Sequence, residues 1–234
     1  MAEWAAKVFW KDVAVKPVAG GFAVTLDGRA VKTPGKQALV LPTRALAEMV
    51  AAEWAAQSGV VRPETMPATR TANSAVEKVA PAREAVVDDL SGYGGSDLLS
   101  YRAEGPAGLV DRQAAAWDPL LDWAAAALEA RLATGVGIVH VPQSPDALAR
   151  LRAEVAAMDD FRLAAFHDLV ALSGSLVLAL AVVHGRLDPE TAWDLSRIDE
   201  DWQAEHWGRD EEAEAAAALK RAAFVHAARF HAAA

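Results

Sequence analysis

One change of pattern along the chain most constrains its fold. The first 41 residues alternate short apolar runs with Gly- and Pro-containing turns, whereas nearly everything after residue 104 is rich in alanine and carries apolar residues at helical spacing. Short runs bounded by turns are typical of antiparallel strands, and a period of about 3.6 residues is typical of helices that bury one face. We therefore predict an α+β protein, with a small N-terminal antiparallel β-containing domain over 1–104 and an all-α helical domain over 105–234.

The strands of the N-terminal domain are expected at 8–15, 22–26, 29–32 and 38–41. Asp27 and Gly28 separate two of these runs, and this pair favours a type I′ hairpin because both central residues need positive φ. The runs contain too few apolar residues to form a stable meander unless another element covers one face.

A helix after residue 43 is predicted to provide that cover. Thr43 is suited to be its N-cap, and Leu46, Val50 and Trp54 follow at spacings of four residues, on one stripe. We therefore expect Trp54 in the core beneath the strands, and a further helical stretch near Thr69.

The second half is predicted to contain helices at 106–133, 145–157, 159–184, 189–207 and 210–232. Asp188 followed by Pro189 is typical of a helix start, and Gly208 is typical of a helix end. The most apolar stretch, 169–183, is 15 residues long, whereas a membrane span needs about 20. We interpret it as a buried helix and expect no membrane insertion.

Composition excludes several classes of function. The chain has no cysteine, which excludes disulfides, thiolate zinc sites and iron–sulfur clusters. Its 23 basic and 32 acidic side chains give a net charge of −9, which argues against nucleic acid as a partner. The sequence has no Walker or dinucleotide-binding glycine loop and no G-x-S-x-G motif. We expect no catalytic residues, no cofactor and no metal.

Two features in the segment 199–212 could still carry function. Asp199, Gln203 and His206 recur at helical spacing and could hold a cation, although a solvated polar helix face is the favoured interpretation. Trp202 and Trp207 are interleaved with acidic residues. Tryptophans are enriched among the anchors of protein interfaces, so these two could bind a protein partner.

Most of the eight tryptophans are expected to pack in the core. In this reading Trp193, Trp202 and Trp207 share the single helix predicted over 189–207.

Several ordered segments together resemble one family. They are VFWKDVAV with LDGRAVKTP, EWAAQ at 53–57, TMPATRTAN at 65–73, SDLLSYRAEGP at 96–106, WDPLLDW at 117–123 and DEDWQAEHWGRDEE at 199–212. In this order they are similar to the assembly chaperones, of mitochondrial and alphaproteobacterial type, that handle the alpha subunit of F-type ATP synthase. Ala68, Thr71 and Ser100 depart from the family pattern at expected packing positions.

The resemblance implies a molecular chaperone and not an enzyme. Such a chaperone binds the free alpha subunit and prevents its aggregation until the beta subunit replaces it. The family's closing motif, W-G-x-x-E, falls on Trp207, Gly208 and Glu211. The partner-binding residues are therefore expected to be Glu211, Trp207, Trp202 and Glu200. We expect a monomer in the bacterial cytoplasm, or in the mitochondrial matrix if a presequence has been removed.

Two other functions remain open at this point. One is a carboxylate- or metal-dependent hydrolase built around Asp199, His206 and Glu211. The other is a general scaffold for a different protein partner.

Overall fold

The computed structural model describes residues 7–234, which form two compact units. The first contains the described residues up to Arg83 together with Asp160–Ala165 and Arg229–Ala234, and the second contains Glu84–Asp159 and Phe166–Ala228. The domain boundary predicted at 104/105 stays a prediction. The observed order, a small antiparallel sheet followed by mostly helical chain, confirms the predicted α+β class.

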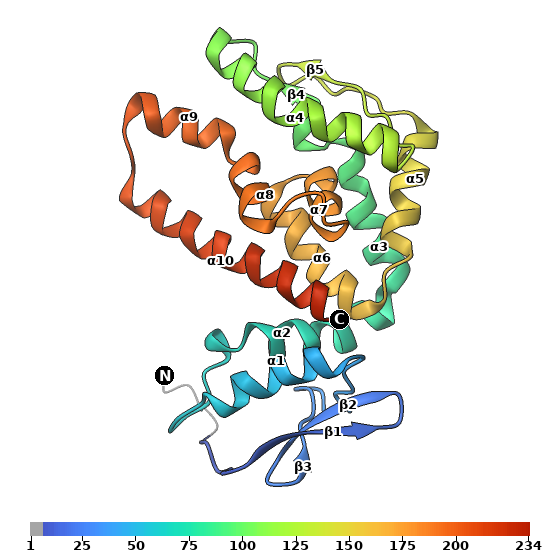
Figure 1. The fold of residues 1–234 in the computed structure, drawn as a ribbon, viewed down its shortest axis with the longest axis vertical. Helices are drawn as coiled ribbons and strands as arrows, with labels where there is room; N and C mark the ends of the chain where they lie inside the picture. The colour runs from blue at the N-terminus through green and yellow to red at the C-terminus, as the bar shows by residue number, and fades with distance from the viewer. Residues whose placement is uncertain (1–6) are drawn as a thin grey trace. The chain divides into compact units, whose positions relative to one another are not determined.

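The sheet of the first unit has the order β1-β2-β3, with strands Val13–Val18, Gly21–Leu26 and Arg29–Ala30, all antiparallel (Figure 1). Asp27 and Gly28 have φ of 46° and 81°, as the predicted hairpin requires.

The first strand begins later than predicted. Oδ1 of Asp27 accepts hydrogen bonds from the backbone N–H groups of Lys11 and Asp12 at 3.0 and 2.9 Å, outside the strand ladder. The fourth predicted strand, 38–41, forms only isolated bridges to Lys32 and Phe22.

Helix α1, Arg44–Ala55, covers this sheet as predicted. The Thr43 hydroxyl accepts a hydrogen bond from the backbone N–H of Leu46 at 3.1 Å, which confirms the predicted N-cap. Leu46 and Val50 are completely buried. Trp54 is only half-buried and meets Trp10 edge-on at 5.3 Å, so it lies at the margin of the core and not within it.

Helix α2, Pro67–Ser74, begins against a carboxylate of α1. The Glu53 side chain accepts hydrogen bonds from the backbone N–H groups of Ala68 and Thr69 at 2.6 and 2.8 Å. It thereby satisfies donors that the first turn of a helix leaves free. Beyond α2 the chain continues as a run of π-helix, Ala75–Val79, and 3₁₀-helix, Ala80–Ala82, that leads into α3, Arg83–Gly92.

The remaining helices are α4 Ala107–Ala127, α5 Pro145–Ala156, α6 Asp160–Ser173, α7 Leu176–Val183, α8 Pro189–Ser196, α9 Ile198–Trp207 and α10 Glu211–Ala233. A two-residue parallel pair, β4 Tyr101–Arg102 and β5 Gly135–Val136, flanks α4 in the chain. Asp188 caps α8 as predicted, through a 2.9 Å bond from the backbone N–H of Thr191. Among the described residues, no helix is both long and apolar enough to cross a membrane.

The helix predicted over 159–184 is broken at Gly174, which has a φ of 68°. A completely buried carboxylate, Asp97, holds this break. It accepts hydrogen bonds from the Ser175 hydroxyl at 2.7 Å and from the backbone N–H groups of Val177 and Leu99, both at 3.0 Å. Burial raises the pKa of Asp97, while these hydrogen bonds act in the opposite direction. One side chain thus caps α7 and fixes the turn that precedes β4.

Replacing Asp97 should destabilise the fold strongly. Asp97→Ala leaves three buried donors without an acceptor, and we expect a loss of about 3 kcal/mol or more. Asp97→Asn keeps the shape but turns an amide N–H₂ toward at least one of these donors, so it should also destabilise. Urea unfolding followed by circular dichroism measures both changes. Asp122→Ala, at an exposed carboxylate on α4, is the control. An Asp97→Ala midpoint equal to that of wild type would show that this carboxylate does not hold the break.

Candidate functional site

The predicted acidic and aromatic segment forms α9, the loop 208–210 and the start of α10, the orange and red helices in Figure 1. Gly208, with a φ of 97°, ends α9 as predicted. Oδ1 of Asp210 accepts hydrogen bonds from the backbone N–H groups of Glu212 and Ala213 at 2.9 and 3.2 Å. Glu211 therefore lies in the first turn of α10 and is exposed.

The prediction of a single helix over 189–207 is wrong. The chain leaves helical geometry at Arg197, where φ is −111° and ψ is 10°, so Trp193 belongs to α8 while Trp202 and Trp207 belong to α9. The Ser196 hydroxyl donates to the carbonyl of Trp193 at 2.7 Å and satisfies an acceptor in the last turn of α8. This break changes the direction of the chain within the acidic segment.

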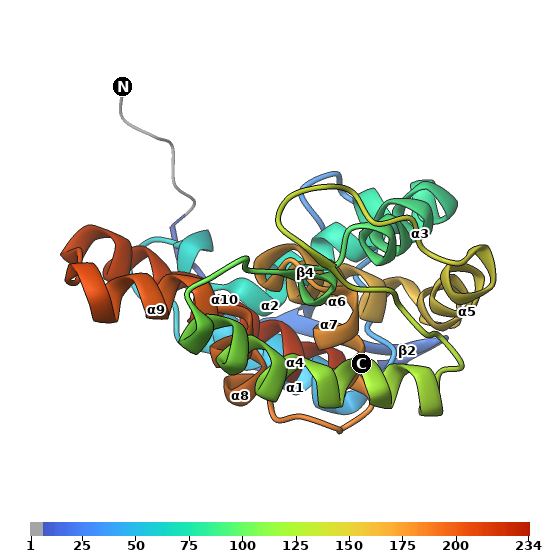
Figure 2. The same ribbon diagram turned by 90° about the horizontal axis from the view of Figure 1, so that it is seen from above.

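Trp202 packs on α4, which lies beside α9 (Figure 1, Figure 2). A Cβ atom on Gly108 would come within 2.8 Å of the Trp202 ring, so the glycine leaves the space that the indole occupies. The Arg112 guanidinium lies 4.9 Å from the centre of the same ring, and His206 stacks on the ring at 4.2 Å. Trp202 therefore serves to attach α9 to α4.

Polar contacts reinforce this attachment. Arg112 donates two hydrogen bonds to the Glu205 carboxylate, at 2.9 and 2.8 Å. They lower the pKa of Glu205 and raise that of Arg112. The pair is therefore ionised at neutral pH and is lost only as the pH falls below the usual range of a glutamate. Gln113 donates to Asp199 at 2.6 Å, which gives α9 a second link to α4.

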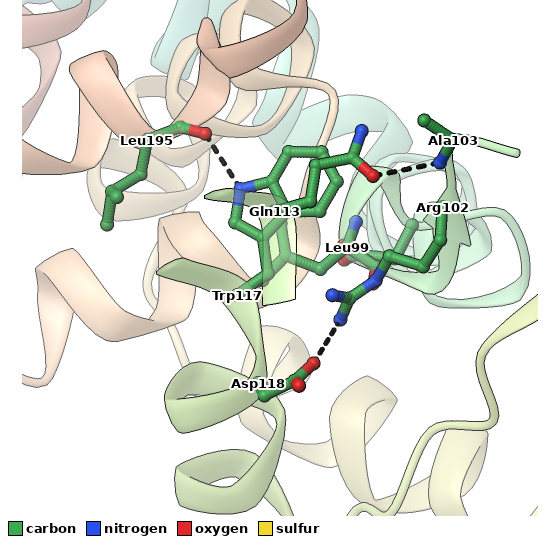
Figure 3. A network of polar contacts seen from close by, with 8 residues as sticks. Leu99, Arg102, Ala103, Gln113, Trp117, Asp118 and Leu195 are labelled. Carbon is green, nitrogen blue, oxygen red and sulfur yellow. Dashed lines mark hydrogen bonds and ion pairs between the residues drawn. The ribbon is translucent and has the colours of Figure 1, made fainter. Parts of the chain in front are cut away.

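Figure 3 shows that the family-like segments 96–106 and 117–123 meet in one polar network. The side-chain carbonyl of Gln113 accepts a hydrogen bond from the backbone N–H of Ala103 at 2.8 Å, and Arg102 forms an ion pair with Asp118 at 2.7 Å. The buried Trp117 donates its indole N–H to the carbonyl of Leu195 at 2.9 Å. Through these contacts α4 also positions the end of α8.

Two of the three residues of the alternative hydrolase have other partners. Asp199 is bound by Gln113, and Nδ1 of His206 lies 2.9 Å from the carbonyl of Trp202. Across residues 7–234, no cluster of three or more His, Asp or Glu side chains has the arrangement of a metal site. The structure therefore offers no specific geometry that favours the hydrolase over the other functions.

Helices α8, α9 and α10 line a groove with a volume of about 610 Å³, within the second unit. Trp207 and Glu200, two of the four predicted partner-binding residues, line this groove. Trp202 and Glu211 do not. Trp207 is 79% exposed and therefore does not lie in the core.

The groove is strongly acidic. Its lining includes two arginines, Arg197 and Arg209, and six carboxylates, from Asp194, Glu200, Asp201, Glu205, Asp210 and Glu214. Arg197 pairs with Glu200 at 2.9 Å, and Arg209 pairs with Glu214 at 3.1 Å. Asp194 and Glu214 were not among the predicted site residues. They join the site only because α10 folds back beside α8 and α9, a turn that the stop at Gly208 and the cap at Asp210 do indicate.

The two tryptophans of α9 should respond differently to truncation. Trp202→Ala removes the half-buried ring between Gly108 and Arg112, and we expect a loss of about 2 kcal/mol, somewhat below the cost at a fully buried tryptophan. Trp207→Ala removes a ring that is mostly in solvent, and the change should stay within about 0.5 kcal/mol. Thermal unfolding of the two variants makes the comparison. Equal destabilisation would contradict the assignment of Trp202 to the α4 contact and Trp207 to the open surface.

The sequence and the fold were compared with those of known proteins, and the matches agree with one another. The sequence model of the ATP12 chaperone protein family matches residues 7–125. The crystal structure of Atp12 from Paracoccus denitrificans has a TM-score of 0.96 and 56% identity, covering 99% of both chains. A crystal structure from Agrobacterium tumefaciens has a TM-score of 0.91 and 43% identity over 95% of this chain and 84% of that one. The mitochondrial protein atp12 of Schizosaccharomyces pombe is 26% identical over 217 residues, which is 88% of this chain and 75% of the relative.

Proposed function

Because the chain belongs to the ATP12 chaperone protein family, we propose that it binds the free alpha subunit of F-type ATP synthase during assembly. It prevents aggregation of that subunit until the beta subunit replaces it. The observation that carries this proposal is the match to Atp12 of Paracoccus denitrificans, 56% identical along almost the whole of both chains. The proposal that the client is the alpha subunit rests on the resemblance of the sequence to the assembly chaperones of ATP synthase.

The proposed task is one of reversible binding and not of catalysis. A subunit made for a ring exposes large apolar interfaces while it is free, and such surfaces aggregate. A chaperone for it must cover part of that surface and still be displaced by the proper neighbour. The exposed Trp207 and the acidic groove beside it support such a role. We propose that the chaperone acts as a monomer, in the bacterial cytoplasm or the mitochondrial matrix.

The choice of partner is tested with purified components. The immobilised protein should retain the free alpha subunit and should not retain the assembled catalytic head, because the surface that it covers is buried there. Retention is measured by quantifying the alpha subunit bound at increasing concentrations. Addition of free beta subunit should release it. Equal retention of the assembled head would contradict the proposal.

Glu211 is the proposed contact from the family's closing motif. It is exposed in the first turn of α10, and Glu212 and Glu214 share that turn, so its loss should hardly change stability. Glu211→Lys should therefore fold normally and bind the alpha subunit much more weakly, because a charge at an interface has been reversed.

Glu212→Lys is the matched control, an equal change of charge at the adjacent exposed residue. Circular dichroism establishes the fold and titration calorimetry measures the affinity. If Glu211→Lys binds the alpha subunit with wild-type affinity, Glu211 serves only to stabilise the N-terminus of α10 and is not a partner contact.

A further inference from the structure

The first half of α10 buries very little surface. From Glu211 to Ala223 every residue is exposed except Ala217, which is half-buried, and Leu219 is 75% exposed. Burial begins only at Phe224, whose ring lies 5.8 Å from that of Trp193 on α8. Most helices in proteins gain their stability from packing one face, and this one leaves several turns open. The open turns therefore form an unpartnered helix surface.

The groove described above runs along this surface. Ala213 and Ala217 line it from α10, one turn apart, and Ala204 lines it from α9. Small side chains allow another backbone to approach closely. Trp207 lies near the loop that joins the two helices, where a large exposed ring can cover an apolar neighbour.

The charges of the groove indicate what such a segment carries. In the part of the chain that the structure describes, the carboxylates of Asp194 and Asp201 form no hydrogen bond or ion pair, whereas Glu200, Glu205 and Glu214 each have an arginine. Partial burial raises the pKa of Asp201. The positive charges of Arg197 and Arg112 act against this shift, while the negative charges of Asp194 and Glu205 add to it. A cationic side chain placed between these carboxylates would relieve their repulsion.

The walls of the groove also favour one backbone conformation. Three helices and the loop 208–210 line it, and the backbone hydrogen bonds of the helices are internal. A peptide in extended conformation would find no strand edge with which to pair its own N–H and C=O groups. A helix brings these bonds with it and needs only a complementary face.

We propose that the groove between α8, α9 and α10 binds an amphipathic helix of the free alpha subunit, with Arg or Lys side chains directed at Asp194 and Asp201. The apolar face of that helix packs on Trp207 and on the alanines of α10. This inference rests on the proposed function, because it names the segment of the client that the chaperone holds.

Cross-linking tests the location and the chemistry of the bound segment. The chain has no cysteine, so a single cysteine can carry a photoreactive benzophenone. Ala213→Cys places it in the groove, and Ala215→Cys places it on an exposed part of the same helix outside the groove. With purified alpha subunit, the label at 213 should react mainly with one segment that has helical apolar spacing and several basic residues. The label at 215 should react much less.

A charge variant tests the proposed cation contacts. The double variant with Asp194→Asn and Asp201→Asn keeps the side-chain shapes and should bind a synthetic peptide of the cross-linked segment about tenfold more weakly. Its binding should also be less sensitive to salt. The control is the double variant with Asp122→Asn and Asp146→Asn, two exposed carboxylates outside the groove. Circular dichroism of the peptide should show gain of helix on binding to wild type.

The outcomes separate the two proposals. If wild type does not retain the alpha subunit at all, the proposed function fails. Three results would leave the proposed function intact and overturn only the groove assignment, provided that retention of the alpha subunit is normal. The first is equal reaction of both labels, the second is a cross-linked segment that is acidic or extended, and the third is wild-type affinity of the Asp194/Asp201 variant. Cross-links from position 213 to a second copy of this chain would likewise overturn it, in favour of self-association.

Discussion

Contact between α9 and α4 depends on a missing side chain. Gly108 has no Cβ atom, and the space this leaves is taken by the ring of Trp202. A rigid indole at that place brings Arg112 over its face and within reach of Glu205, so one aromatic contact carries a charged pair with it. The face of α9 that bears Trp202 is thereby used for attachment. Trp207, elsewhere on α9, takes no part in this attachment and stays exposed.

The carboxylates around α9 differ in whether they have a partner. Glu205 is bound by Arg112 and Asp199 is bound by Gln113, both from α4. Among the other acids that line the groove, Glu200 and Glu214 are also paired with arginines, whereas the carboxylates of Asp194 and Asp201 form no hydrogen bond or ion pair with the described residues. Arg197 and Arg112 offset part of the repulsion between Asp201 and its acidic neighbours. We therefore place the proposed cation contacts at Asp194 and Asp201 and not at the paired acids.

Local signals predicted the local structure well. Thr43 and Asp188 cap helices as their side chains suggest, because capping needs only neighbouring backbone groups. The breaks at Gly174 and Arg197 were missed, since tertiary partners stabilise them: Asp97 caps α7 from a distant segment, and Trp117 binds the carbonyl of Leu195. Periodicity cannot contain such information.

Prediction of the candidate site was limited for a related reason. Trp202 and Trp207 are five residues apart, and at about 100° per residue they point roughly 140° away from each other on a helix. Their shared acidic surroundings suggested one surface, but helix geometry already separates them. The contribution of α10 to the groove could be anticipated only as far as the turn at Gly208 and Asp210. Asp194 lies on α8, before the break at Arg197 that separates α8 from α9, and that break was not predicted.

The exposure of the groove bears on how a chaperone could release its client. Ion pairs at exposed positions contribute at most about 1 kcal/mol each and are screened by salt, but they accelerate encounter. A partner held by such pairs, together with one exposed indole, associates quickly and is not locked in place. A deep apolar pocket would instead bind the client tightly and would compete with the subunit that has to replace the chaperone. An open acidic groove on an unpartnered helix therefore suits a chaperone that a better-fitting subunit has to displace.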